Sequence, residues 1–110
     1  MKTSLWVWIW QRISAVLLLV LVWVHFGIMH FVDPTASITF AHSTLRLQNA
    51  LYFLVDSCLL ILGLFHGLNG LRNIILDYWP KAGRASAWVL GLLGVVLTVY
   101  GFTALFAFLN

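Results

Sequence analysis

The chain has 110 residues, of which 63% are hydrophobic and only 8% are charged, with a formal net charge of +3. A water-soluble domain usually carries about 25% charged residues, so this composition excludes a globule in water and favours a lipid bilayer as the solvent. The single cysteine, Cys58, excludes a disulfide framework and a cysteine-rich metal site on this chain. Six scattered basic residues do not form a nucleic-acid-binding surface.

Three stretches are long and apolar enough to cross a bilayer, which requires about 20 residues of helix. They cover residues 13–32, 50–75 and 85–109. The first and third contain no Lys, Arg, Asp or Glu, whereas the second contains Asp56, His66 and Arg72. The sequence therefore predicts an all-α integral membrane protein with three transmembrane helices, which form a single anchor domain over 1–110.

The segments outside these spans are polar or rich in tryptophan. Residues 1–12 carry three tryptophans, which are typical of the headgroup interface, and no signal-peptide cleavage site follows, so we expect a retained first span. Polar residues over 33–47 predict an exposed loop. In the shorter segment 77–84, Pro80 ends a helix and Gly83 lies in the turn.

The distribution of Lys and Arg predicts the orientation, because cytoplasmic segments carry an excess of these residues. One predicted side holds Lys2, Arg12, Lys81 and Arg84, with Arg72 close by. The other side holds only Arg46. We therefore expect the N-terminus and the 77–84 segment in the cytoplasm and the C-terminus outside.

His66 is the most informative residue within the spans, because ionisable groups in hydrocarbon are costly and usually mark a site. Gly63, Gly67 and Gly70 flank it at three- and four-residue spacing. A neutral imidazole suits an axial ligand of haem iron, and glycines leave room for the macrocycle. The same pattern is equally typical of close helix packing around a hydrogen-bonded histidine. The residues alone leave both interpretations open.

Three further histidines require an interpretation. His42 lies in the polar loop, where we expect it to be solvated. His25 and His30 are five residues apart, so they point about 140° apart on a helix and are not expected to share one iron. Measured from the inner boundary, His25 lies about 20 Å deep and His66 about 18 Å deep, at similar or modestly different levels. This estimate leaves open whether they serve one haem or two.

A second group of polar and aromatic residues is expected at the cytoplasmic edge. Its members are Arg12, Ser14, Arg72, Asp77, Tyr78 and Trp79. An arginine fork matches a haem propionate, and a tyrosine hydroxyl beside an aspartate can hydrogen-bond a quinone carbonyl and relay a proton. Aromatic and basic residues at this level are also the usual anchors of a membrane helix. Asp56, in the outer part of the second span, is expected to be neutral or paired with Arg46.

The stretch His66-Gly-Leu-Asn-Gly-Leu-Arg-Asn-Ile-Ile-Leu-Asp77-Tyr78 resembles the His-x-x-x-Gly…Asp-Tyr segment of the small hydrophobic (D-type) anchor subunit of succinate dehydrogenase (succinate:quinone oxidoreductase, complex II). The Gln11-Arg12-Ile-Ser14 stretch is similar to the Arg-x-Ser/Thr start of the same subunit. His25 and Asp56 fall where one bacterial branch of the family has a His and an Asp.

The resemblance implies a role for each candidate residue. His66 would be an axial ligand of haem b, and His25 would ligate a second haem in branches that have two. The additional His30 leaves the ligand of the first span, and the number of haems, open. Tyr78 and Asp77 would contribute to a ubiquinone or menaquinone pocket. The remaining candidates near a haem propionate or the quinone are Arg12, Arg72 and Ser14.

The resemblance also implies partners and a location. The chain would be a multi-pass subunit of the bacterial cytoplasmic (inner) membrane, with no catalytic residue of its own. A second, cytochrome b-type anchor, an iron–sulfur subunit and a flavoprotein would join it, and the FAD and the clusters would lie on those soluble subunits. Electrons from succinate oxidation in the tricarboxylic acid cycle would pass to membrane quinone and the respiratory chain.

Three alternatives stay open at this point. The chain is also compatible with the anchor of a fumarate reductase or with a haem-free structural subunit. A small multidrug-type transporter is disfavoured, because it would be expected to have four spans and a carboxylate in the first, and residues 13–32 contain no carboxylate.

Overall fold

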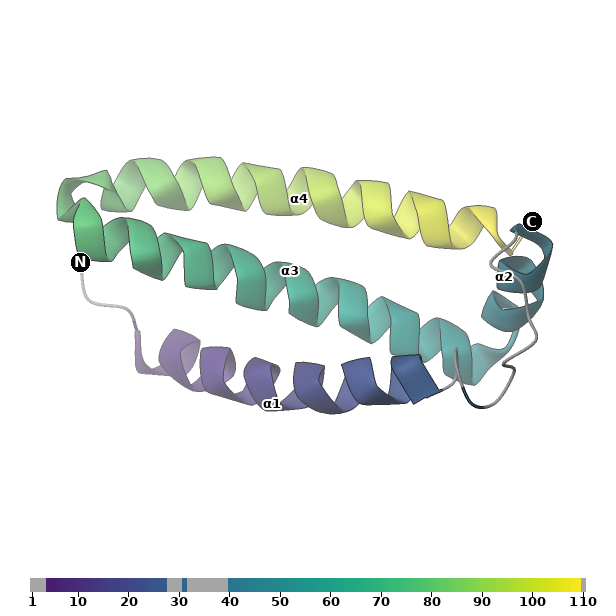
Figure 1. Ribbon diagram of the computed structural model, residues 1–110. Helices are drawn as coiled ribbons and strands as arrows, with labels where there is room; N and C mark the ends of the chain where they lie inside the picture. Colours follow the sequence, from purple (N-terminus) through teal and green to yellow (C-terminus); the bar gives the residue numbers. More distant parts are fainter. Residues whose placement is uncertain (1–3, 28–30, 32–39, 110) are drawn as a thin grey trace.

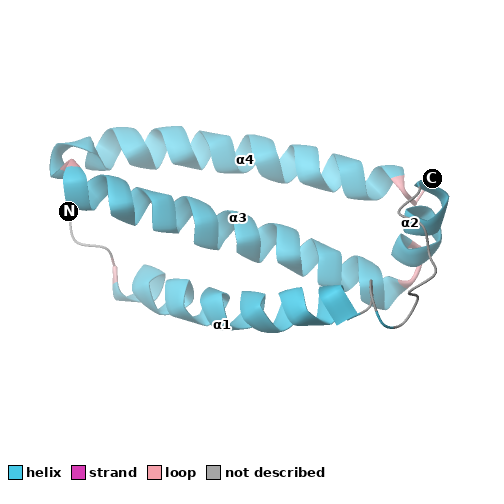
Figure 2. Cartoon of the chain, in the orientation of Figure 1, coloured by secondary structure: helices cyan, strands magenta, loops and turns pink. Residues whose placement is uncertain are grey.

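The computed structural model describes residues 4–27, 31 and 40–109, and within these ranges it contains helices and no strand (Figure 2). The elements in chain order are α1 (Leu5–Gly27), α2 (Phe40–Leu47), α3 (Ala50–Tyr78), the 3₁₀ helix η2 (Pro80–Ala82) and α4 (Gly83–Ala107). The helices α1, α3 and α4, the last together with η2, are long and apolar enough to cross a membrane. The prediction of an all-α protein with three apolar spans is confirmed.

The three long helices lie in a row, with α3 in the middle and α1 and α4 on its two flanks (Figure 1). The resulting slab measures 50 × 26 × 20 Å. Because each outer helix packs on α3 alone, two faces of α3 stay uncovered along its length. Most side chains are therefore exposed, and the buried apolar ones are Leu47, Val55 and Leu90. In lipid this arrangement carries little penalty, because apolar side chains gain nothing by leaving the acyl chains for each other.

The first helix begins at Leu5, eight residues before the predicted span at 13–32. Its start is capped by Ser4, whose hydroxyl oxygen accepts a hydrogen bond from the backbone N–H of Val7 at 3.2 Å. The tryptophan-rich segment is thus part of the helix rather than a separate interfacial stretch. The described part of α1 ends at Gly27, and the end of the predicted span lies outside the described residues.

Two predicted connections differ from the structure. The prediction of a loop over 33–47 was wrong for Phe40–Leu47, which form α2. The connection at 77–84 is tight as predicted, because Pro80 cannot continue α3 and instead opens η2. However, Gly83 has helical dihedral angles (φ −56°, ψ −49°) and is the first residue of α4, so its prediction as a turn residue was wrong.

Glycines allow α4 to approach α3 closely. A Cβ atom on Gly94 would lie 3.0 Å from Cδ1 of Leu68, and one on Gly101 would lie 2.7 Å from both Cδ atoms of Leu60. Small residues at such positions let membrane helices pack through van der Waals contact. Close packing at these glycines therefore joins α3 and α4 along most of their length, with a hydrogen bond from Arg72 to the carbonyl of Gly83 at the start of α4. The α1–α3 pair, described next, is joined mainly by polar side chains.

Candidate functional site

One face of α1 carries the polar residues that contact α3. Ser14 and His25 are eleven residues apart, so they project within about 20° of each other on the helix. Each of these two side chains contacts a polar side chain of α3, and the contacted residues are His66 and Asp56. The α1–α3 interface therefore contains two polar sites, one around His66 and one around His25.

At the His66 site, the side chain of Ser14 is fully buried between the two helices. Its Oγ donates to the backbone carbonyl of Gln11 at 3.0 Å and lies 3.2 Å from Nδ1 of His66. A hydroxyl has one proton, and the shorter contact to the carbonyl uses it, so Oγ accepts from the Nδ1–H of His66. This assigns the tautomer with the proton on Nδ1, which leaves a lone pair on Nε2.

Gln11 joins the same site with both ends of its amide. Its Nε2 donates to the backbone carbonyl of His66 at 3.3 Å, and its Oε1 accepts from Nδ2 of Asn69 at 2.8 Å. A Cβ atom on Gly70 would lie 3.3 Å from the Nε2 of Gln11, so the glycine provides the space for this amide. Gln11 and Asn69 were not predicted as site residues, although two amides within apolar helices near a histidine were a usable signal.

The glycines around His66 have two different roles. Gly70 faces Gln11, whereas a Cβ atom on Gly63 or on Gly67 would meet nothing within 4 Å. His66 itself is partly exposed. The flank of α3 next to the imidazole is therefore open on the side of Gly63 and Gly67, and closed by α1 on the side of Gly70.

At the His25 site, Nδ1 of His25 lies 3.1 Å from Oδ1 of Asp56. The His25 side chain is 38% exposed, while that of Asp56 is 20% exposed. The alternative that Asp56 pairs with Arg46 was wrong, because the packing of α1 on α3 places the carboxyl group of Asp56 opposite His25. In the part of the chain that the structure describes, no contact joins Asp56 to Arg46.

The two sites lie at different levels along the helices. His66 is level with Ser14, and His25 lies eleven residues further along α1, a separation of about 16 Å. The prediction of similar or modestly different depths was wrong, because α1 begins at Leu5 and Arg12 therefore lies two turns inside the helix rather than at its boundary. The two imidazoles are too far apart to bind one iron.

The residues that the sequence predicts to lie together at the cytoplasmic edge do not all lie together in the structure. Tyr78 and Trp79 are exposed at the end of α3, with ring centroids 6.1 Å apart, and Asp77 beside them is exposed as well. Ser14 does not join them, because its contact His66 lies twelve residues, or about 18 Å, from Tyr78 along α3.

The two arginines of the group, Arg12 and Arg72, also have different partners. The guanidinium of Arg12 lies over the ring of Trp8, 4.9 Å from its centroid. Arg72 donates from Nη2 to the carbonyl of Gly83 at 3.3 Å, while its buried Nε has no hydrogen-bond partner. Six residues separate Arg72 from His66, which places the two about 120° apart around α3. Arg72 therefore lies on a different face of α3 from the histidine.

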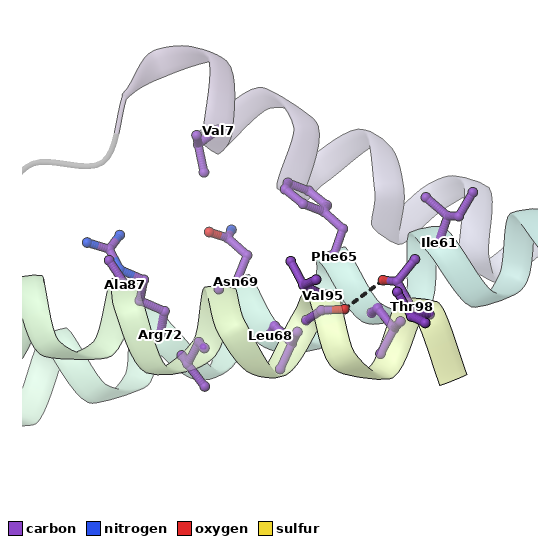
Figure 3. Close-up of a pocket in the computed structure, with 14 residues that line it drawn as sticks. Val7, Ile61, Phe65, Leu68, Asn69, Arg72, Ala87, Val95 and Thr98 are labelled. Atoms are coloured by element: carbon purple, nitrogen blue, oxygen red, sulfur yellow. Dashed lines mark hydrogen bonds between the residues drawn. The ribbon is translucent and has the colours of Figure 1, made fainter. Parts of the chain in front are cut away.

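Arg72 lies in a groove of about 770 Å³ along α3 and α4 (Figure 3). Its wall is mainly apolar, with Phe65 and Leu68 from α3 and Val95 from α4, and Val7 of α1 borders it. Asn69 and Arg72 are the polar side chains near one end of the groove (Figure 3). Two faces of α3 are left open by α1 and α4. One of them carries Gly63 and Gly67, and the groove lies on the opposite one.

Two histidines considered in the sequence cannot be placed. His30 lies outside the described residues, and so does the side chain of His42.

Comparison with known proteins identifies related sequences. A model of the succinate dehydrogenase/fumarate reductase transmembrane subunit family matches residues 1–104. The chain is similar to the succinate dehydrogenase 2 membrane subunit SdhC of Mycobacterium tuberculosis (strain H37Rv), with 29% identity over 101 residues, covering 87% of the chain and 72% of the relative. No solved structure gives a significant match.

Proposed function

The chain belongs to the succinate dehydrogenase/fumarate reductase transmembrane subunit family, and on this premise we propose that it is a haem b- and quinone-binding membrane anchor of a bacterial succinate:quinone oxidoreductase. We place it in the cytoplasmic membrane, with the Tyr78 end of α3 at the cytoplasmic face beside an iron–sulfur subunit, a flavoprotein and a second anchor. The relative is named SdhC, so assignment to the D-type anchor stays a prediction.

The hydrogen-bonding state of His66 is the observation that carries the proposal. An iron-ligating histidine characteristically donates its other ring N–H to a protein acceptor, which sets the tautomer and the orientation of the ring. Nδ1 of His66 has such an acceptor in Ser14, and no hydrogen bond joins its Nε2 to another described residue. The open flank at Gly63 and Gly67 leaves space beside the imidazole for a flat macrocycle. These residues fit a haem.

When bound, the haem would supply a one-electron reservoir whose potential depends on its axial ligands and on the apolar surroundings. The residues of this chain hold the ligand in place. Ser14 fixes the ring of His66 through Nδ1, and Gln11 ties the backbone of His66 to α1. Arg12, which is exposed on α1, carries a guanidinium that matches a propionate. Arg72 lies on the other open face of α3, in the wall of the groove, where its guanidinium can serve a carboxylate or a quinone oxygen.

The quinone part of the proposal rests on the end of α3. Tyr78 is 75% exposed and Asp77 beside it is exposed, so both are accessible to a ligand held between this chain and a neighbouring subunit. The phenol can donate a hydrogen bond to a quinone carbonyl, and the carboxylate can pass a proton to it from water. The apolar groove leading away from Arg72 suits an isoprenoid tail.

Replacing His66 tests the function. In purified complex, His66→Ala should remove a b-type band from the reduced-minus-oxidised spectrum, because alanine offers no lone pair to iron. Succinate oxidation with an artificial dye should continue, since that reaction takes place on the soluble subunits. A spectrum that is unchanged in His66→Ala would refute haem ligation and leave a haem-free structural anchor as the better description.

A further inference from the structure

The side chain of Gln11 contacts the turn of α3 that carries His66. His66, Asn69 and Gly70 are three and four residues apart, so they lie on one side of α3. Nε2 of Gln11 donates to the backbone carbonyl of His66 at 3.3 Å, and Oε1 accepts from Nδ2 of Asn69 at 2.8 Å. A carbonyl oxygen can only accept, so the nitrogen end of the Gln11 amide must face His66. The amide therefore has a single orientation across this turn.

Gly70 lies where the amide of Gln11 crosses α3. A Cβ atom at this position would lie 3.3 Å from Nε2 of Gln11, and within 4 Å it would meet no other group of the described residues outside its own helix turn. In an α-helix the backbone N–H of residue 70 donates to the carbonyl of residue 66, the same oxygen that Gln11 contacts. The amide thus lies against one backbone hydrogen bond of α3, and a side chain on Gly70 would displace it.

The backbone of Gln11 contacts the histidine by a second route. Its carbonyl accepts from Oγ of Ser14 at 3.0 Å, and the same Oγ lies 3.2 Å from Nδ1 of His66. The side chain of Gln11 therefore holds the backbone of His66, while its carbonyl holds the hydroxyl that bonds to the imidazole. The position of the ring relative to Ser14 depends on both contacts.

Packing of two helices in lipid does not by itself require such an arrangement. The neighbouring helix α4 packs on α3 through Gly94 and Gly101, by van der Waals contact. An amide bonded at both ends adds a fixed rotation of one helix relative to the other, because each donor must point at its acceptor. A histidine that ligates a metal requires this kind of constraint, since its partners set the orientation of its ring.

We propose that Gln11 is a positioning residue for His66: it fixes the turn of α3 from which the imidazole projects, and so keeps Nδ1 opposite Ser14 and the plane of the ring in one orientation. Asn69 orients the amide of Gln11, and Gly70 provides the space for it. The inference rests on the proposed function, because it concerns the haem ligand proposed there.

Gln11→Met tests the inference in the intact, purified complex, because methionine has a similar size but can neither donate nor accept in place of the amide. Haem per flavin should be retained, since His66 and Ser14 remain. The EPR signal of the oxidised low-spin haem depends on the orientation of its axial imidazoles. For the component that His66→Ala removes, this signal should shift and broaden. Its midpoint potential should rise, because a weaker contact with Ser14 lowers the basicity of the ring.

Two asparagines separate the ends of the amide and provide a control. Asn69→Leu removes the partner of Oε1 but leaves the contact of Nε2 with His66, so it should shift the EPR signal and the potential in the same direction by a smaller amount. Asn73 lies one turn further along α3 and has no hydrogen bond with Gln11. Asn73→Leu should leave both quantities unchanged.

Gly70→Ala gives a second, independent test. Alanine favours a helix more than glycine does, so this variant should fold, while its Cβ displaces the amide and should reproduce the shift seen in Gln11→Met. In a Gln11→Ala background, Gly70→Ala should cause no further shift, because the one side chain that the Cβ meets has been removed. If Gln11→Met does not assemble or does not retain the haem, this pair of variants decides the matter.

Two results would overturn the inference. One is a wild-type EPR signal and potential in Gln11→Met, and the other is a shift in Gly70→Ala that is equally large with and without Gln11. Both would leave the proposed function intact, because His66 could then ligate iron without help from Gln11. A spectrum that does not change in His66→Ala would instead refute the proposed function, so the two failures are distinguishable.

Discussion

Ser14 and His66 are 52 residues apart in the sequence, yet the hydroxyl of Ser14 lies 3.2 Å from Nδ1 of His66 and is completely shielded from solvent. Between helices in lipid the hydrophobic effect supplies little attraction, so polar contacts and close packing decide how the helices are aligned. The contact therefore sets the register of α1 on α3 and at the same time sets the orientation of the imidazole.

Removing the Ser14 hydroxyl should weaken haem binding at His66. Substitution of an outer partner of a metal ligand typically costs about 10- to 100-fold in metal affinity, so Ser14→Ala should retain haem correspondingly less well during purification. Haem per flavin and the reduced spectrum measure this. Ser86→Ala is a matched control, because Ser86 is also buried and also donates to the carbonyl three residues earlier, at 3.0 Å, but faces no histidine. Equal haem loss in both variants would contradict the prediction.

The amide pair formed by Gln11 and Asn69 should show energetic coupling. Hydrogen bonds between membrane helices contribute about 0.6 kcal/mol on average and at most about 1.7 kcal/mol. A double-mutant cycle of Gln11→Ala and Asn69→Ala, read from the free energy of unfolding in detergent micelles, should give a coupling in this range.

The cycle has a control in Asn73, which lies one turn further along α3 and has no hydrogen bond with Gln11. Gln11→Ala and Asn73→Ala should be additive. Coupling of similar size in both cycles would mean that the measured energy does not arise from the 2.8 Å contact.

Tyr78→Phe should separate quinone reduction from succinate oxidation. If the phenol assists proton transfer to a quinone, its removal should slow quinone reduction by about 100-fold, the lower end of the usual effect of a general acid. Succinate oxidation with an artificial dye should be unaffected. Tyr100→Phe is the control, since Tyr100 is 73% exposed, close to the 75% of Tyr78, but lies on α4 toward the other end of the slab. Equal loss of both activities in Tyr78→Phe would argue against a quinone role.

Gly101→Ala should destabilise the packing of α4 on α3. The added Cβ would lie 2.7 Å from both Cδ atoms of Leu60, so the leucine must leave its rotamer, and such overpacking costs about 1–3 kcal/mol. Gly91→Ala should be close to neutral, because nothing lies within 4 Å of a Cβ atom at Gly91. The free energy of unfolding of the two variants in micelles measures the difference, and similar values would show that Leu60 adjusts without penalty.

Much of the fold follows from local sequence features. A run of about 20 apolar residues in lipid must satisfy its own backbone hydrogen bonds, so hydropathy alone predicted the three helices and their order. The helix start at Leu5 was less predictable, because the cap formed by Ser4 depends on a single residue rather than on a long pattern. The short helix α2 was missed, because its eight residues are too few to give a clear pattern. The roles of His25, His66 and Tyr78 with haem and quinone, and the cytoplasmic location of the N-terminus, stay predictions.

The sequence by itself determined that this membrane protein has three long apolar helices with ionisable groups within them, because both properties depend on composition along a single helix. Only the tertiary structure decided which polar groups meet: Ser14 with His66, and Asp56 with His25 rather than with Arg46. Such pairings depend on the rotation of each helix about its axis and on its shift along its neighbour. Both are set by packing between helices, which no pattern within one helix encodes.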